Sequence, residues 1–175
     1  MAKTKDKYLL DANVFIEAHR RYYNSSICPG FWTALLRQHE KGTVASIDRV
    51  CAELNAIKDG LCEWVKESAP DSFFKKTDDQ RVVACFSDMM QWVAGQSQFT
   101  GEAKSEFATA ADGWVMAYAK ANGLCVVTHE EISLNARRRV PMPNVCRQFG
   151  VKYCNTFQML MDLGEKFVAS SKVGK

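Results

Sequence analysis

The chain has 175 residues and a formal charge of +3, from 23 Lys and Arg against 20 Asp and Glu, an excess that is compatible with nucleic-acid binding without arguing for it. Hydrophobic residues make up 47% and charged residues 25%, which is typical of globular proteins and excludes a disordered chain. The charged first residues and the short apolar run after them argue against a signal peptide or membrane span, so we expect a cytoplasmic location.

Strand and helix patterns alternate from the start of the chain. Residues 8–10 are predicted to form a buried strand that ends at Asp11, and residues 43–47 are predicted to form a second one. Between them, residues 31–41 have the spacing of an amphipathic helix. Asp48 is expected to cap the helix that follows the second strand.

The second half of the chain continues this alternation. Residues 77–80, Thr-Asp-Asp-Gln, have the form of a capping box and predict a helix to about residue 94. After a polar loop, a long helix is expected to end at Asn122, and residues 124–128 are the clearest strand. The other expected elements are a short helix at 144–149, a strand at 151–153 and a final helix capped by Asn155.

The order of these elements predicts an α/β fold. We expect three layers, α/β/α, with a central, mostly parallel sheet of about four strands and helices on both faces. One domain is expected over residues 1–163, followed by a flexible C-terminal tail over residues 164–175.

The seven cysteines form no Cys-x-x-Cys pair, and most of them lie inside apolar runs. We interpret them as small, reduced core residues rather than as a zinc site or a disulfide framework.

Several acidic residues occupy positions where a purely structural carboxylate is unexpected. Open parallel sheets place their ligand sites outside the carboxyl ends of the strands. Asp11 and Glu130 each follow a predicted strand, and Glu131 is next to Glu130. Glu53 and Asp112 lie on helix faces that are otherwise apolar. We therefore expect these side chains to converge on one site.

Converging carboxylates need a counter-charge, because an unpaired buried carboxylate costs several kcal/mol or takes up a proton. Without a nearby Lys or Arg in the pattern, the acids predict a hard divalent cation, and oxygen ligands suit Mg²⁺ or Mn²⁺. Such ions activate water and neutralise charge on a phosphodiester.

Each acid also has a structural alternative. Asp11 could instead cap the turn after its strand. Glu53 could lie at the edge of the apolar stripe, where its side chain reaches solvent. The run Thr109-Ala-Ala-Asp112 matches a capping box, which would give Asp112 a structural role at a helix start. Glu130 follows a strand, where exposed acids are common.

Four segments, taken in order, resemble the motifs of PIN domains. Residues 9–16, Leu-Leu-Asp-Ala-Asn-Val-Phe-Ile, resemble the opening motif, and residues 46–54, which contain Glu53, resemble the second. Residues 111–128 are similar to the third motif and the strand after it, and residues 128–130, Thr-His-Glu, stand where many PIN domains have Thr-x-Asp. Residues 140–146 resemble the terminal segment of a little-characterised bacterial branch of PIN-like proteins.

This resemblance implies a metal-dependent ribonuclease that hydrolyses RNA phosphodiester bonds with Mg²⁺ or Mn²⁺. In many bacterial relatives the protein is the toxin of a toxin–antitoxin pair, so the expected partners are RNA, an antitoxin protein and a second copy of the chain. The resemblance assigns Asp11, Glu53, Asp112 and Glu130 as metal-binding and catalytic residues, with Asn13 and Thr128 supporting them by hydrogen bonds.

Basic and aromatic residues near this site are candidates for substrate contacts. Arg137, Arg138 and Arg139 lie in the loop after Glu130, where they are expected to hold phosphates; a solvated charge run is the alternative. Four aromatic residues are candidates for stacking on bases, with core packing as the expected role of the last two: Tyr22, Tyr23, Phe31 and Trp32.

Two other functions compete with the nuclease. One is a catalytically inactive PIN-like module that binds RNA or a protein. The other is a phosphotransfer domain of the receiver or haloacid-dehalogenase type. The latter needs a second Asp two residues after the first, where this chain has Asn13, and a receiver needs paired acids after the first strand.

Overall fold

The computed structural model describes residues 7–169. A central sheet has the strand order β3-β2-β1-β4-β5, and every neighbouring pair is parallel. The strands are β1 (Tyr8–Leu10), β2 (Val44–Ile47), β3 (Phe74–Lys75), β4 (Cys125–Val127) and β5 (Lys152–Cys154).

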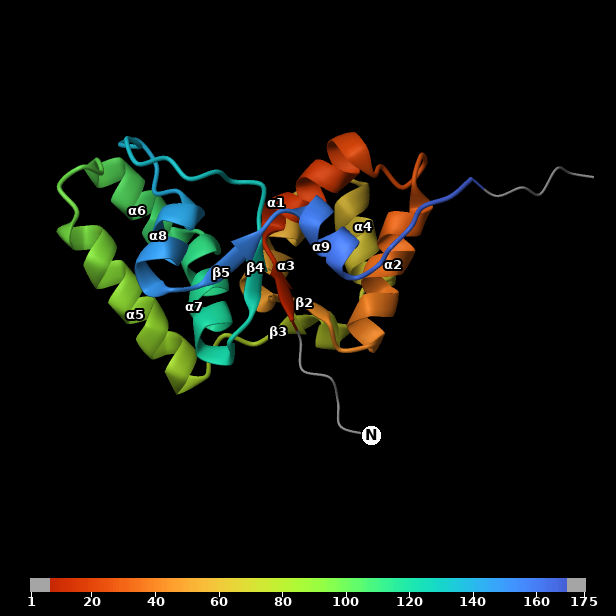
Figure 1. Ribbon diagram of the computed structural model, residues 1–175, viewed down its shortest axis with the longest axis horizontal. Helices are drawn as coiled ribbons and strands as arrows, with labels where there is room; N and C mark the ends of the chain where they lie inside the picture. The colour runs from red at the N-terminus through yellow and green to blue at the C-terminus, as the bar shows by residue number, and fades with distance from the viewer. Residues whose placement is uncertain (1–6, 170–175) are drawn as a thin grey trace, which may run out of the picture.

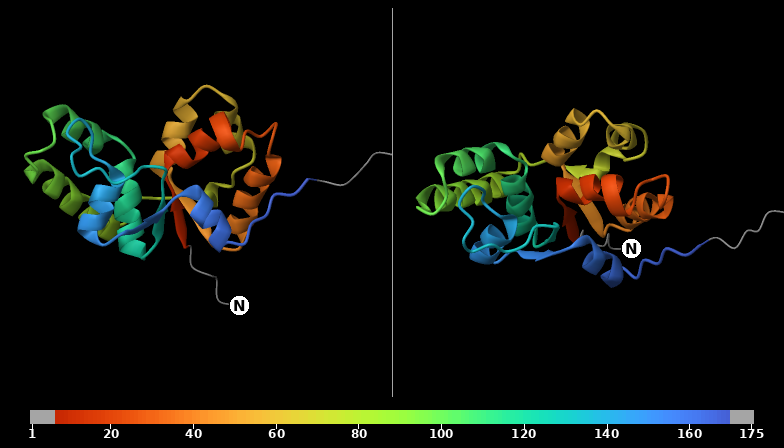
Figure 2. Two further views of the ribbon diagram at one scale, coloured as in Figure 1. Left: turned by 45° about the horizontal axis from the view of Figure 1, so that its top comes forward. Right: turned by 90° about the horizontal axis from the view of Figure 1, so that it is seen from above.

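Helices cover both faces of this sheet, as Figure 1 shows with the strands in the middle. On one side lie α5 (Gln80–Gly95), α6 (Gly101–Thr109), α7 (Asp112–Asn122) and α8 (Met142–Phe149). On the other lie α1 (Ala12–Glu17), α2 (Pro29–Glu40), α4 (Gly60–Glu67) and α9 (Thr156–Asp162). The remaining helical segments are α3 (Asp48–Ala56), the π-helix η1 (Ala18–Tyr22) and the 3-10 helix η2 (Asp71–Phe73). Both views in Figure 2 keep the two helical groups apart.

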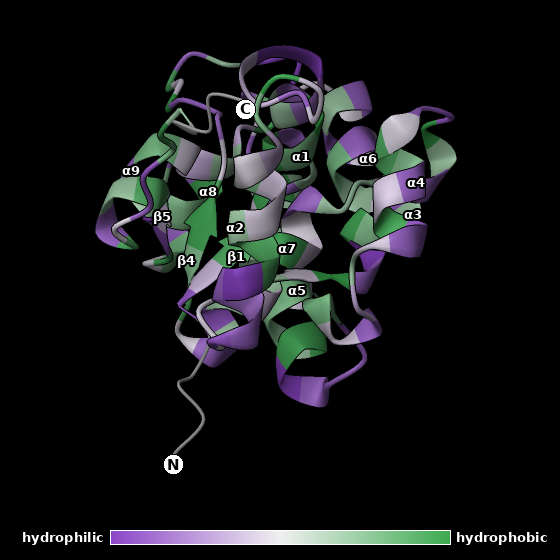
Figure 3. Cartoon of the chain, turned by 90° about the vertical axis from the view of Figure 1, so that its right-hand side faces the viewer, coloured by the Kyte–Doolittle hydropathy of each residue, from purple (hydrophilic) through white to green (hydrophobic). Residues whose placement is uncertain are grey.

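The predicted α/β fold class with three layers is confirmed, but the predicted strand number was too low by one. The central strands are short apolar runs with both faces covered; Leu9, Leu10, Val126 and Val127 are completely buried. In Figure 3 the strands β1 and β4 are coloured as hydrophobic, whereas the helices around them carry both hydrophilic and hydrophobic residues. The missed strand, β3, has only two residues, too few to produce a periodic pattern.

Two predicted helix caps are wrong, for a shared reason. The helix α3 begins at Asp48 itself, and the Asp48 carboxylate accepts hydrogen bonds from the hydroxyl and N–H of Thr77. Thr77 is therefore occupied, and α5 is capped instead by Asp79, which accepts from the Arg81 N–H at 2.8 Å. A tertiary contact between two predicted caps replaces the local contacts that the sequence suggested.

The long helix predicted to end at Asn122 is two helices. The chain leaves the helical conformation at Ala110, which has a ψ of 161°, so that α6 ends and α7 begins within three residues. Gly123 ends α7 with a left-handed φ of 68°, and the predicted Asn155 cap of α9 is confirmed by a reciprocal capping box with Gln158.

Part of the predicted C-terminal tail contacts the domain. Glu165 accepts hydrogen bonds from the side chains of Arg37 and Gln38 on α2, and Phe167 packs edge-on against Phe31. Residues 164–169 therefore lie along α2, and residues 170–175 of the predicted tail are outside the described residues.

All seven cysteines are free, but only Cys62 and Cys146 are buried in the core and the other five are half-buried. The Sγ atoms of Cys125 and Cys154 lie 3.7 Å apart across neighbouring strands. Within residues 7–169, the helices are all too short or too polar to cross a membrane.

Candidate functional site

The side chain of Asp11 is completely buried at the carboxyl end of β1, in the middle of the sheet. Its N–H donates to the Val127 carbonyl at 3.0 Å, which aligns the ends of β1 and β4. The Thr128 hydroxyl donates to Asp11 Oδ2 at 3.3 Å, whereas Asp11 Oδ1 is buried without a hydrogen-bond partner among the described residues. An unsatisfied buried acceptor costs about 1–3 kcal/mol, more when charged, so this oxygen requires a positive partner or a proton.

Asp112 and Glu53 reach the site from two helices, where the charge of Asp112 acts on Asp11 and the charge of Glu53 acts on Asp112. The half-buried Glu53 extends from α3, and its Oε1 accepts the Ala111 N–H at 2.9 Å. Ala111 is the N-cap residue of α7, where no side chain of α7 itself supplies a capping hydrogen bond. Glu53 thus ties α3 to the start of α7 and fixes the position of the next residue, Asp112.

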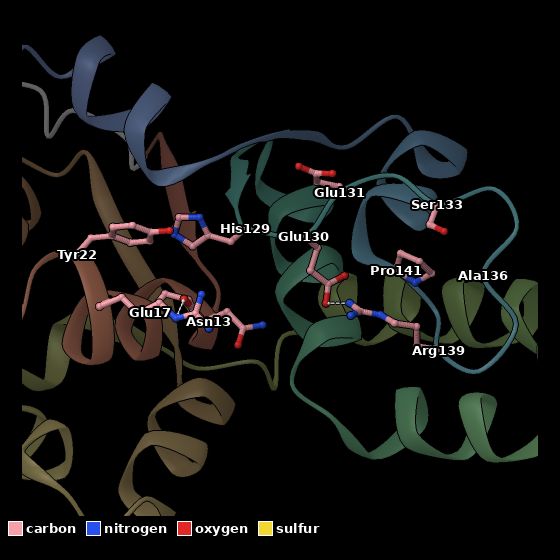
Figure 4. A pocket seen from close by; sticks show the side chains of 11 residues that line it. Asn13, Glu17, Tyr22, His129, Glu130, Glu131, Ser133, Ala136, Arg139 and Pro141 are labelled. Carbon is pink, nitrogen blue, oxygen red and sulfur yellow. Dashed lines mark ion pairs between the residues drawn. The ribbon is translucent and has the colours of Figure 1, made fainter.

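Glu130 reaches the same region from the loop after β4. Its side chain is 11% exposed, and both of its carboxylate oxygens are engaged. One oxygen forms an ion pair with Arg139, and the other accepts the Met142 N–H at 2.7 Å. Glu131 is exposed and points elsewhere (Figure 4), so Glu130 is the acid of this pair that belongs to the site.

An acidic pocket of about 300 Å³ is lined by Asp112 and Glu130, the two acids whose charges act on Asp11. Asp11 itself is completely buried and does not form part of the pocket lining. The pocket contains one acid that the sequence analysis missed, Glu106 on α6, which reads in the sequence as an ordinary exposed helix residue. The polar residues that line this acidic pocket are Asn13, Glu53, Glu106, Asp112, Glu130 and Arg139.

Mutual repulsion and burial alter the acid–base properties of these carboxyl groups. Burial raises the pKa of Asp11 well above its ordinary value, and the charges of Asp112 and Glu130 raise it further. Burial also raises the pKa of Asp112 from 3.8 to about 6, with further increases from Glu130 and Glu53 and an opposing effect from Arg139. Because these groups influence one another, they lie in one electrostatic site rather than on separate surfaces.

Two structural alternatives from the sequence fail. The Thr109 hydroxyl donates to the carbonyls of Ser105 and Glu106 and so forms no capping box with Asp112. Asp11 stands at the N-cap position of α1, but its side chain makes no capping hydrogen bond. Glu53 does have a structural role, as the acceptor for the Ala111 N–H, which leaves its second oxygen for a ligand.

The site fits a divalent cation in chemistry but is not assembled as a ready coordination sphere. The donors are carboxylates, which Mg²⁺ and Mn²⁺ prefer, and Asp11 Oδ1 is a buried donor without a partner. Within residues 7–169, however, no three His, Cys, Asp or Glu side chains lie close enough together to hold an ion as they stand. Both carboxylate oxygens of Glu130 already have partners, Arg139 and the Met142 N–H, so neither is free to bind an ion as the site stands.

The predicted substrate residues are only partly at the site. Among the described residues, Arg139 lines the acidic pocket, whereas Arg137 and Arg138 are exposed on the same loop outside it. Phe31 and Trp32 are buried in the core, as expected, and Tyr23 stacks on Phe31 at 4.5 Å. Tyr22 is 55% exposed and lines a second pocket, which shares Asn13, Glu130 and Arg139 with the acidic one (Figure 4).

A family profile described as "Domain of unknown function (DUF4411)" matches residues 8–167. The chain belongs to the DUF4411 family. No curated protein matches this DUF4411 chain. Among solved structures, it is similar to FitAcB from Neisseria gonorrhoeae, with a TM-score of 0.54 and 19% identity over 86% of this chain and 98% of that one. At this identity the likeness shows the fold alone, and that fold is PIN-like.

Asp112→Asn is expected to stabilise the protein without divalent ions at pH 7.5. The pKa of Asp112 is higher in the folded chain than in the unfolded one, so its contribution to stability is lost as pH rises from 3.8 through about 6. Removing the charge should add about 1–3 kcal/mol above that range and almost nothing at pH 4. Urea unfolding in EDTA across this pH range measures the effect.

The matched control is Asp88→Asn, at an exposed position on α5. Equal stability differences for Asp112→Asn at pH 4 and pH 7.5 would show that the Asp112 carboxylate is not strained by its neighbours.

Proposed function

We propose that this protein is a divalent-metal-dependent ribonuclease that hydrolyses RNA phosphodiester bonds. The observation that supports it most strongly is the buried, unpartnered Oδ1 of Asp11, next to Asp112 and Glu130 at the carboxyl edge of a parallel sheet. A group of repelling carboxylates in this position costs stability, and proteins accept such costs at functional sites.

In this proposal Asp11 and Asp112 hold Mg²⁺ or Mn²⁺, with Glu53 and Glu130 completing the acidic surround. A bound ion of this kind supplies an activated water and neutralises charge on the phosphodiester. The Thr128 hydroxyl orients Asp11 through its hydrogen bond to Oδ2, and the Glu130 N–H in turn donates to the Thr128 oxygen at 3.2 Å. Asn13 lines the pocket beside them.

Exposed rings beside the acidic pocket support RNA as the substrate. The rings of Tyr22 and Phe157 meet edge to face at 5.7 Å, and Phe157 meets the ring of His129 at 6.0 Å. Burial lowers the pKa of His129, so this ring is neutral at pH 7.5. The three rings form a partly exposed aromatic shelf on which an unpaired base can stack. Arg137 and Arg138 lie exposed on the nearby loop and suit phosphate contacts.

The toxin role is the finer part of this proposal. It rests on the motif resemblance to PIN domains, which implies a toxin that an antitoxin protein neutralises, and the fold similarity to FitAcB is consistent with that resemblance. A second copy of the chain is a further proposed partner. The proposed location of the protein is the cytoplasm.

The alternative is a catalytically inactive PIN-like module that binds RNA or a protein. It is favoured by one specific observation, the incomplete coordination sphere, in which Glu53 and Glu130 already accept backbone N–H groups.

Asp11→Asn should abolish cleavage of a fluorescently labelled RNA in the presence of Mn²⁺ or Mg²⁺. Loss of a supporting partner of a metal ligand alone costs about 10–100-fold, so loss of a ligand should lower the rate by at least about 100-fold. Asp88→Asn serves as the control and should cleave at the wild-type rate. Intact RNA in every divalent ion with the wild-type protein, together with retained RNA binding, would support the inactive module instead.

Tyr22→Ala should weaken RNA binding by about 5- to 100-fold, the range that base stacking worth about 1–3 kcal/mol gives. The measurement is fluorescence anisotropy of a single-stranded oligonucleotide in the Asp11→Asn background, which prevents cleavage. Tyr22→Phe keeps the ring and should bind like the parent. Unchanged affinity in Tyr22→Ala would exclude the aromatic shelf as a base contact.

A further inference from the structure

Arg139 introduces a positive charge into the acidic pocket. Among the described residues that line this pocket, it is the only cation, facing Glu53, Glu106, Asp112 and Glu130. Figure 4 shows its guanidinium group turned toward Glu130, and the two form an ion pair. Its place in the sequence predicted a contact with substrate phosphates, whereas in this structure its partner is a carboxylate of the site itself.

This ion pair determines where Glu130 points. With one oxygen on Arg139 and the other on the Met142 N–H, the Glu130 carboxylate is held at its position in the loop. A divalent ion that used Glu130 as a ligand would require the oxygen that Arg139 occupies or the one that Met142 occupies. The Met142 N–H is a backbone group at the first residue of α8, so the Arg139 contact is the easier one to release.

The backbone around Arg139 is held, whereas its side chain is not. The Gln98 side chain donates to the carbonyls of Leu134 and Ala136, and the Thr100 N–H donates to the Arg137 carbonyl at 2.9 Å. The Arg139 side chain is 59% exposed. Release from Glu130 therefore needs only side-chain rotation toward solvent, without movement of the loop.

We propose that Arg139 is the internal counter-cation of the acidic site, and that a divalent ion binds in competition with it for Glu130. This inference rests on the proposed function. Without the ion, Arg139 offsets part of the repulsion among the carboxylates. With the ion bound, Arg139 leaves Glu130, and its planar guanidinium becomes available for a substrate phosphate at the same pocket. One side chain thus alternates between two anionic partners.

The test is Mn²⁺ affinity without RNA, measured from the electron paramagnetic resonance signal of free Mn²⁺. Arg139→Gln removes the competing charge and should bind Mn²⁺ about 10-fold more tightly, equivalent to about 1.4 kcal/mol. Arg139→Lys keeps the charge and should remain near the wild-type affinity. Arg147→Gln, an exposed arginine on α8, controls for the change in net charge.

A second readout separates competition from a general electrostatic effect. With saturating Mn²⁺ and a hydrolysis-resistant analogue of the RNA, Arg139→Gln should weaken RNA binding while Arg147→Gln should not, so that one substitution acts in opposite directions on metal and RNA. If Arg139→Gln does not fold by circular dichroism, Arg139→Met, which keeps the aliphatic stem, replaces it.

The outcomes are distinguishable. Wild-type protein that binds Mn²⁺, with Arg139→Gln no tighter than wild type, would overturn the competition and leave the proposed function standing. An equal gain in Arg147→Gln would show a nonspecific charge effect and would also overturn it. Absence of Mn²⁺ binding in the wild type and in Arg139→Gln would remove the metal-dependent function and this inference together.

Discussion

The site depends on one constraint, the burial of the Asp11 carboxylate at the edge of the sheet with one oxygen unpartnered. A charge in that position must be neutralised by a proton or by a cation, because the surrounding strands are apolar. Asp112 and Glu130 add negative charge to the same region and raise the proton affinity of Asp11. The buried Asp11 carboxylate therefore requires a proton or a cation, and in the proposed function that cation is a divalent ion.

The fold brings four distant segments to this position by simple means. The parallel pairing of β1 with β4 places Asp11 beside Thr128, and the loop after β4 supplies Glu130. The helix break at Ala110 places the start of α7, and so Asp112, at the same edge. Glu53 links α3 to that start through the Ala111 N–H, which makes it a structural residue and a candidate ligand at once.

The sequence predicted what depends on local pattern and missed what depends on tertiary contact. The strands ending at Asp11 and Thr128 and the Asn155 cap follow from short-range rules, and the structure has them. The pairing of Asp48 with Thr77 joins residues 29 apart and overrides two local caps. The Arg139 ion pair and the approach of Glu106 depend on how a loop and a helix turn toward the site, which residue spacing does not encode. The family resemblance predicted the convergence of the acids but not the cation already among them.

The most direct test is a crystal structure of the wild-type protein grown with Mn²⁺, in which anomalous scattering locates the ion. The account predicts an anomalous peak in the acidic pocket, within about 2.0–2.3 Å of oxygens of Asp11 and Asp112. A pocket without a peak at saturating Mn²⁺, with Asp11 unchanged and still unpartnered, would contradict the claim that this buried carboxylate exists to bind a divalent ion.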